Sequence, residues 1–148
     1  MQDVTIKSVI AGMVSVIFKD LFDYLYIHFG FSGVLMLKVA AGAFISVDTI
    51  SYVGLIIGFF AHYVVGGIIG LSFTHYLCLT NTSHPILKGL FAGLVAWLFL
   101  AGMLLKFGIS DYDPIDESSN FMLLIDHIVF GITMGFLNKT VVLKNGTK

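Results

Sequence analysis

The sequence contains no arginine and only one cysteine. All eight basic residues are lysines, so no guanidinium group is present to clamp a phosphate or a carboxylate through two hydrogen bonds. Cys78 stands alone, which excludes an intramolecular disulfide and any CxxC metal or redox site. The formal net charge of −1 supplies no basic stripe. We therefore expect no binding to nucleic acid.

Charged residues of either sign are scarce. They make up 11% of the 148 residues, whereas a soluble domain carries roughly 25%. Apolar residues make up 57%, and the mean hydropathy is +0.96. A surface with so few charges cannot face water without aggregating, so most of the chain must face lipid or itself. This composition predicts a single all-α domain, residues 1–148, integral to the lipid bilayer.

Catalytic and metal-binding motifs are missing as well. The sequence has no HExxH and no GxSxG, and no paired acids on a water-facing loop that would mark a hydrolytic site. The acidic stretch "SDYDPIDESS" lacks the spacing and the glycine of an EF-hand calcium loop. We predict no catalytic residue, no metal site and no enzymatic activity.

The chain does contain four long apolar stretches. A helix that crosses a bilayer needs about 20 such residues. The segment 32–46 is apolar but shorter, and Lys38 interrupts it; segments of this size are more often interfacial or re-entrant than spanning. We expect a four-helix membrane bundle with this segment between its first two helices. The spans are expected at residues 6–29, 51–79, 86–107 and 115–137.

Two prolines mark the predicted beginnings of the third and fourth spans. Pro85 follows Thr82 and Ser83, which can cap the third helix. The fourth is expected to begin with Asp113 as its cap and Pro114 in its first turn.

The distribution of lysine predicts the orientation of the protein. Four spans place both termini on the same side, and the side with more lysine is normally cytoplasmic. We expect a multi-pass protein of the cell membrane with both termini in the cytoplasm. That side would hold Lys7, Lys88, Lys139, Lys144 and Lys148, and the other side Lys38 and Lys106.

Ionisable residues lie deep within the predicted spans. Lys19 is ten residues along the first helix from Val9, or about 15 Å, near the middle of the bilayer, where a charge costs about 2.5–3.5 kcal/mol. Asp23 is one turn further on, close enough to pair with it. Other acids and histidines have compatible depths. We define the predicted polar cluster as Lys19, Asp20, Asp23, His62, Asp126 and His127.

The charges of this cluster do not balance. One lysine faces three aspartates, and two unpaired negative charges are strongly disfavoured away from water. Either an aspartate stays protonated, or histidines take up protons, or a cation binds. Each outcome makes the cluster sensitive to protons or ions. The alternative is that the cluster only holds helices together, since hydrogen bonds between membrane helices contribute about 1 kcal/mol or less each.

Glycines recur at four-residue intervals in three of the predicted spans. In "GLIIGFFAHYVVGGIIG" they form a row that His62 interrupts. Small residues at this spacing let helix backbones approach closely, so a neighbouring helix in this groove would lie against His62. The predicted packing positions are Gly54, Gly58, Gly66, Gly70, Gly89, Gly93, Gly131 and Gly135.

Four segments carry a resemblance to a known family. "IAGMVSVIFKDLFD", the His62 stretch, "GLFAGLVAWLF" and "DHIVFGITMG" resemble the YagU and YqhR-type small bacterial membrane proteins. The better matches are Lys19 with an acid four residues later, His62, and His127. The resemblance implies a bacterial four-span protein with a polar cluster, and it implies no reaction because the biochemical role of these families is unassigned.

Three functions remain open from the sequence. The first is a proton- or ion-linked channel or transporter component that uses the polar cluster. The second is an accessory or assembly subunit, in a homo-oligomer or a larger membrane complex, that binds another membrane protein through its glycine-rich faces. The third is a haem protein with His62 and His127 as axial ligands on facing helices.

Overall fold

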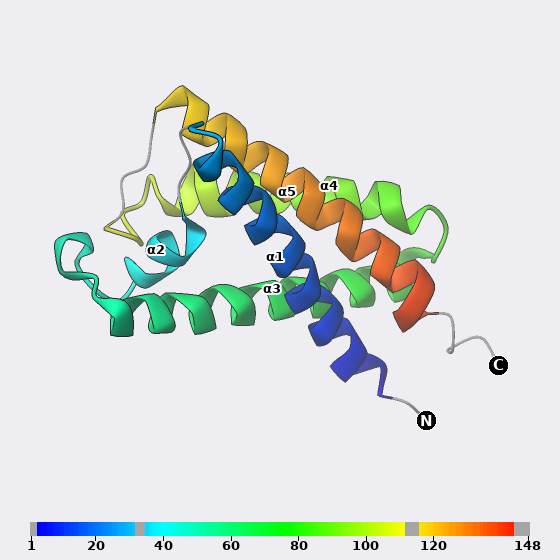
Figure 1. Ribbon diagram of the computed structural model, residues 1–148. Helices are drawn as coiled ribbons and strands as arrows, with labels where there is room; N and C mark the ends of the chain where they lie inside the picture. The colour runs from blue at the N-terminus through cyan, green and yellow to red at the C-terminus, as the bar shows by residue number, and fades with distance from the viewer. Residues whose placement is uncertain (1–2, 32–34, 112–115, 144–148) are drawn as a thin grey trace.

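The computed structural model describes residues 3–31, 35–111 and 116–143. Every regular element within these ranges is helical, which confirms the predicted all-α class (Figure 1). Three helices are long and apolar enough to cross a membrane. They are α3 (Tyr52–Thr80), α4 (Pro85–Trp97) with its π-helical continuation η2 (Leu98–Leu104), and α5 (Glu117–Leu137) with its π-helical continuation η3 (Asn138–Val142).

The helix α1 (Val4–His28) is of similar length, with 25 residues. It is not among the helices that qualify as membrane spans by composition, because Lys19, Asp20 and Asp23 lie within it. The first predicted span, residues 6–29, is therefore present as a helix, while its passage through a membrane stays a prediction.

Two helices begin differently from the prediction. Asp116 caps α5: its Oδ1 accepts a hydrogen bond from the Ser119 backbone N–H at 2.8 Å. The helix therefore begins at Glu117 rather than at residue 115, and the predicted cap at Asp113 and Pro114 lies outside the described residues. The residue before α4 is His84, whose side chain makes no capping hydrogen bond. The predicted caps Thr82 and Ser83 do not occupy that position.

The long helices are arranged in the order α3, α1, α5, α4. The helix α4 packs along α5, α5 packs against α1, and α1 packs against α3. Although α3 and α4 are consecutive in the chain, they make few contacts with each other. In Figure 1, α3 runs along one side of the molecule and α4 and α5 along the other, with α1 crossing between them. A closed four-helix bundle is therefore not confirmed.

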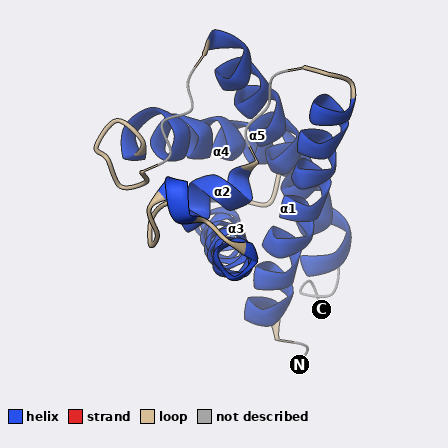
Figure 2. Ribbon diagram, turned by 60° about the vertical axis from the view of Figure 1, so that its left-hand side comes forward, coloured by secondary structure: helices blue, strands red, loops and turns tan. Residues whose placement is uncertain are grey.

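The short helix α2 (Met36–Ala41) partly fills the open side between α3 and α4. Figure 2, which looks along α3, shows α2 lying against it. Met36 and Val39 of α2 are buried with Ala101 and Leu123, which belong to the α4 and α5 side. The 3-10 turn η1 (Val47–Thr49) then leads into α3. The predicted segment 32–46 thus contains a six-residue helix packed between longer helices; its residues 32–34 lie outside the described ranges.

Glycines lie where α1 meets α3. A Cβ atom built on Gly70 would lie 2.6 Å from both the Gly12 Cα and the Ser8 carbonyl oxygen. Gly66, one turn earlier, contacts the side chain of Val16. The two backbones are therefore too close for any larger side chain at these positions.

A second glycine contact joins α4 and α5. A Cβ on Gly89 would lie 2.9 Å from the Gly135 Cα, and a Cβ on Gly93 would lie 3.0 Å from the Gly131 Cα. Each glycine of one helix thus meets the backbone of the other. The remaining two predicted packing glycines lie near α2 and the loop after it: Gly58 against Leu37 and Ala41, and Gly54 beside Ile45 and Ile50.

We predict that Gly131→Ala lowers the free energy of unfolding by about 1–3 kcal/mol, because overpacking a tight contact forces the backbones apart. The added Cβ would lie 3.0 Å from the Gly89 carbonyl carbon and 3.1 Å from the Gly93 Cα. Gly102→Ala is the matched control, since its Cβ would meet only Leu98 Cδ1, at 3.8 Å. Titration with SDS in mixed micelles measures both values. Equal losses for the two variants would contradict the prediction.

Candidate functional site

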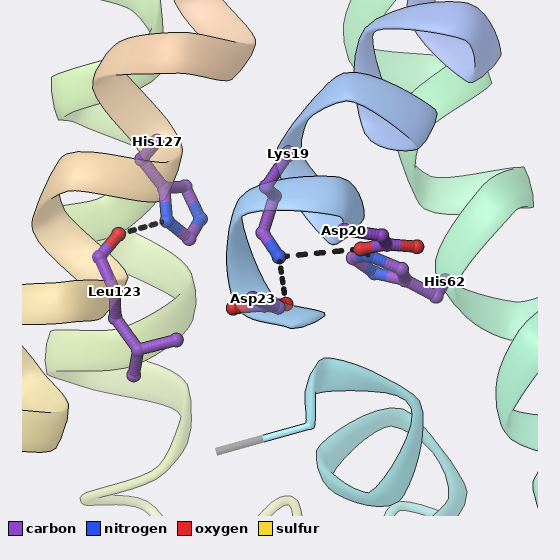
Figure 3. Close-up of polar contacts among 6 residues, drawn as sticks. All are labelled: Lys19, Asp20, Asp23, His62, Leu123 and His127. Atoms are coloured by element: carbon purple, nitrogen blue, oxygen red, sulfur yellow. Dashed lines mark hydrogen bonds and ion pairs between the residues drawn. The ribbon is translucent and has the colours of Figure 1, made fainter. Parts of the chain in front are cut away.

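Three members of the polar cluster lie on α1. The Lys19 side chain is buried, with 2% of its surface exposed. Its Nζ lies 2.9 Å from Asp23 Oδ2 and 3.4 Å from Asp20 Oδ1 (Figure 3). The first contact joins residues one helical turn apart, as their spacing predicts. The Lys19 ammonium group therefore contacts two carboxylates at once, and both belong to the same helix as Lys19.

His62, which interrupts the glycine row on α3, contacts one of these two carboxylates. His62 Nε2 lies 3.1 Å from Asp20 Oδ1, on the oxygen that Lys19 also contacts. The contact depends on the approach of α1 to α3 at Gly66 and Gly70, which lie one and two turns further along α3 from His62. His62, Asp20 and Lys19 thus form a continuous chain of contacts between the two helices.

The third helix of the site, α5, contributes His127. Its Nδ1 lies 2.7 Å from the Leu123 carbonyl oxygen (Figure 3). Because a carbonyl oxygen only accepts hydrogen bonds, Nδ1 carries a proton, and in the neutral ring Nε2 is then the acceptor. The ring is buried, so this acceptor is held inside the protein.

Asp126, the neighbour of His127, is fully buried with 0% of its surface exposed. Neither of its carboxylate oxygens has a hydrogen-bond partner among the described residues. Asp23 and Lys19 are the charged side chains that act on it most strongly. An ionised carboxylate without a partner is costly in such a place. The cluster therefore holds three carboxyl groups: Asp20 and Asp23 share one amine, and Asp126 meets no donor but lies within hydrogen-bonding reach of the Asp23 carboxyl group once one of the two is protonated.

A cavity of about 20 Å³ lies among α1, α3 and α5, with Met36 of α2 and Leu100 of η2 also in its lining. Lys19, His62 and His127 line it together with apolar side chains such as Val16 and Phe130. A single water molecule needs about 10–15 Å³ of such space and two or more polar partners. The cavity therefore has the size and the lining for one water molecule between α1, α3 and α5.

The cavity is too small for a porphyrin. His62 and His127 face it from two helices, but His62 Nε2 contacts Asp20. In this arrangement the two rings do not bracket a haem, and haem binding stays a prediction without a structural observation in its favour. Nor do the described residues contain a group of three His, Cys, Asp or Glu side chains placed to hold a metal ion.

One buried polar contact escaped the sequence analysis. Thr74 Oγ1 on α3 donates a hydrogen bond to Asn138 Oδ1 at 2.6 Å, and both side chains are buried. Thr74 continues the four-residue steps of Gly66 and Gly70, so its place on the face toward α1 and α5 was readable from spacing. Its partner was not, because that depends on how the helices cross.

Comparison with known proteins gives no match: no family model, no curated protein and no solved structure matches the chain. The resemblance to the YagU and YqhR-type proteins therefore stays a prediction.

We predict that Lys19→Met lowers the free energy of unfolding by about 3 kcal/mol, because removing one partner of a buried ion pair leaves the other charge unpaired. The double variant Lys19→Met/Asp23→Asn should recover part of this loss. Lys38→Met is the control, since Lys38 is an exposed lysine and surface changes stay within about 0.5 kcal/mol. Unfolding in mixed micelles measures all three. A Lys19→Met protein as stable as the control would contradict the prediction.

Proposed function

We propose that this chain is a multi-pass integral membrane protein whose polar cluster takes up and releases a proton, as a component of a proton-linked channel or transporter. The observation that carries the proposal is Asp126, a fully buried carboxyl group without a hydrogen-bond donor among the described residues, beside the Asp23 carboxyl group and a single lysine that already contacts two carboxylates.

The distribution of polarity on α1 supports a place in the membrane for this helix too. Lys19 and Asp23 are buried, whereas Ile10, Ile17 and Leu21 are exposed. A water-soluble protein arranges its helices in the opposite way, with charged residues outward and apolar residues inward. This inversion suits a helix with lipid outside and a polar interface inside. It supports α1 as a fourth span beside the three helices that qualify by composition.

The ends of the helices support the proposed orientation. The beginning of α1, the end of α3, the beginning of α4 and the end of α5 lie at one end of the molecule (Figure 1). Lys7, Lys88 and Lys139 belong to these segments. By the lysine rule, this end and both termini would face the cytoplasm.

In this proposal the proton binds at Asp126 and exchanges with the groups around it. A proton on Asp126, or one shared with the neighbouring Asp23 carboxyl group, removes the unpaired charge. The water-sized cavity places His62 and His127 around Lys19. The acceptor nitrogen of His127 and a water molecule in this cavity would extend the cluster as a short hydrogen-bonded relay. Proton relays inside membrane proteins are commonly built from Asp, Glu and His side chains.

The glycine-rich faces favour this proposal over that of an accessory subunit. Gly66 and Gly70 are covered by α1, and Gly89 and Gly93 are covered by α5. Faces occupied within the chain are not free to bind another membrane protein. An accessory role, in a homo-oligomer or a larger complex, would require other surfaces.

Reconstitution into liposomes that contain a pH-sensitive dye tests the function. The protein should transmit a proton gradient, and Asp126→Asn should reduce the initial rate at least tenfold, because an amide of the same shape cannot exchange the proton. Asp48→Asn is the matched control, since Asp48 is exposed on the turn before α3. Monodisperse elution of both variants checks their folding. The proposal is refuted if liposomes that contain the wild-type protein are no more permeable to protons than empty liposomes.

A further inference from the structure

A second cavity lies at the other end of the open side between α3 and α4, away from α2. Its volume is about 1040 Å³, at the upper end of the roughly 300–1,000 Å³ that ligand pockets occupy. Its walls come from the end of α3, the beginning of α4, the end of α5 with η3, and Val4 at the start of α1. It lies where α3 and α4 diverge from their shared turn.

The polar side chains that line this cavity lie at one end of it, where the apolar Val4, Val142 and Leu143 also lie, and the opposite end is apolar. Thr82, His84 and Lys139 are its polar members and lie near the ends of the helices. Leu90 and Ile132 lie deeper, six residues into α4 and seven residues back from Lys139. At 1.5 Å per residue these offsets correspond to about 10 Å. A polar rim above an apolar interior of this depth matches an amphipathic molecule with a head group and a hydrocarbon chain.

The charge of the rim selects the sign of the head group. Lys139 is exposed, and none of the described residues that line the cavity is acidic. The beginning of α4 adds to this charge, because His84 leaves the first turn without a side-chain cap and a helix N-terminus carries a partial positive charge. Lys88 is already held by Asn81, through both the carbonyl oxygen and Oδ1 at 2.8 Å. Among the described residues that line the cavity, Lys139 is therefore the lysine available at the rim.

We propose that this cavity binds one anionic phospholipid of the surrounding membrane, with an acyl chain between α4 and η3 and the phosphate against Lys139 and the beginning of α4. The inference rests on the membrane location in the proposed function and is independent of proton uptake by Asp126. A hydrocarbon-lined space that opens at the level of the head groups is filled by lipid in a membrane, and the rim favours an anionic lipid over a neutral one.

Native mass spectrometry of the protein released from mixed vesicles of phosphatidylglycerol and phosphatidylcholine, with identical acyl chains, tests this inference. We expect one retained phosphatidylglycerol per chain. Lys139→Gln should weaken its retention about fivefold to tenfold, since one lysine near an anionic surface contributes about 1 kcal/mol. Lys106→Gln is the matched control, because Lys106 is exposed at the opposite end of the molecule. Equal retention of both lipids, or equal losses in both variants, would overturn the inference.

The only cysteine of the chain provides a second readout within the cavity. Cys78 is exposed and lines the cavity wall. In detergent, added phosphatidylglycerol should slow its alkylation by a maleimide, whereas inorganic phosphate should not, because phosphate lacks the acyl chain. Leu90→Trp should fill the interior and abolish the lipid-dependent protection. Protection by phosphate alone, or a bound peptide in place of lipid, would refute the inference.

The two proposals can fail separately. If lipid retention is lost while proton flux is intact, only this inference is overturned. If proton flux is lost while lipid retention is intact, only the proposed function is overturned.

Discussion

The close contact between the backbones of α1 and α3 is the constraint on which the site depends. Gly70 admits the Gly12 backbone where a single added carbon would lie 2.6 Å from its Cα. At this separation His62 reaches Asp20, and Asp20 shares Lys19 with Asp23. A wider separation would leave His62 facing a gap, and the contacts from α3 to the α1 charges would be lost. The packing of the small residues therefore determines which charged side chains can come into contact.

The charges of the cluster in turn explain which side chains are buried and which are exposed. Lys19, Asp23, Asp126 and His127 lie inside, whereas large apolar side chains of every long helix lie outside. In lipid this arrangement is the favourable one, since the outer surface meets hydrocarbon and each buried polar group can find a partner within the protein. Asp126 departs from that pattern because neither of its oxygens has a hydrogen-bond partner in the described part of the chain. The buried Trp97 Nε1 also has no hydrogen-bond partner among the described residues, but of these two groups only the carboxyl group can exchange a proton near neutral pH.

Local rules predicted the features that depend on neighbours in the sequence. Helical spacing paired Lys19 with Asp23, and hydropathy placed the long helices to within a few residues. Features that depend on how helices cross were not predictable in this way. The contact of His62 with Asp20, the bond between Thr74 and Asn138, and the open side between α3 and α4 belong to this class. The beginning of α5 was mispredicted for a local reason, because Asp113 and Asp116 both qualify as caps and the sequence does not rank them.

The two sets of glycine contacts divide the molecule into two halves. The helices α1 and α3 touch backbone to backbone, as do α4 and α5, while α1 and α5 pack through side chains such as Val16 and Phe130. The polar cluster lies across this side-chain contact, with Lys19 and Asp23 on one half and Asp126 and His127 on the other. In the proposed function, a change of charge at Asp126 falls at the contact between these two pairs of helices, so proton uptake would be coupled to the way one pair packs on the other.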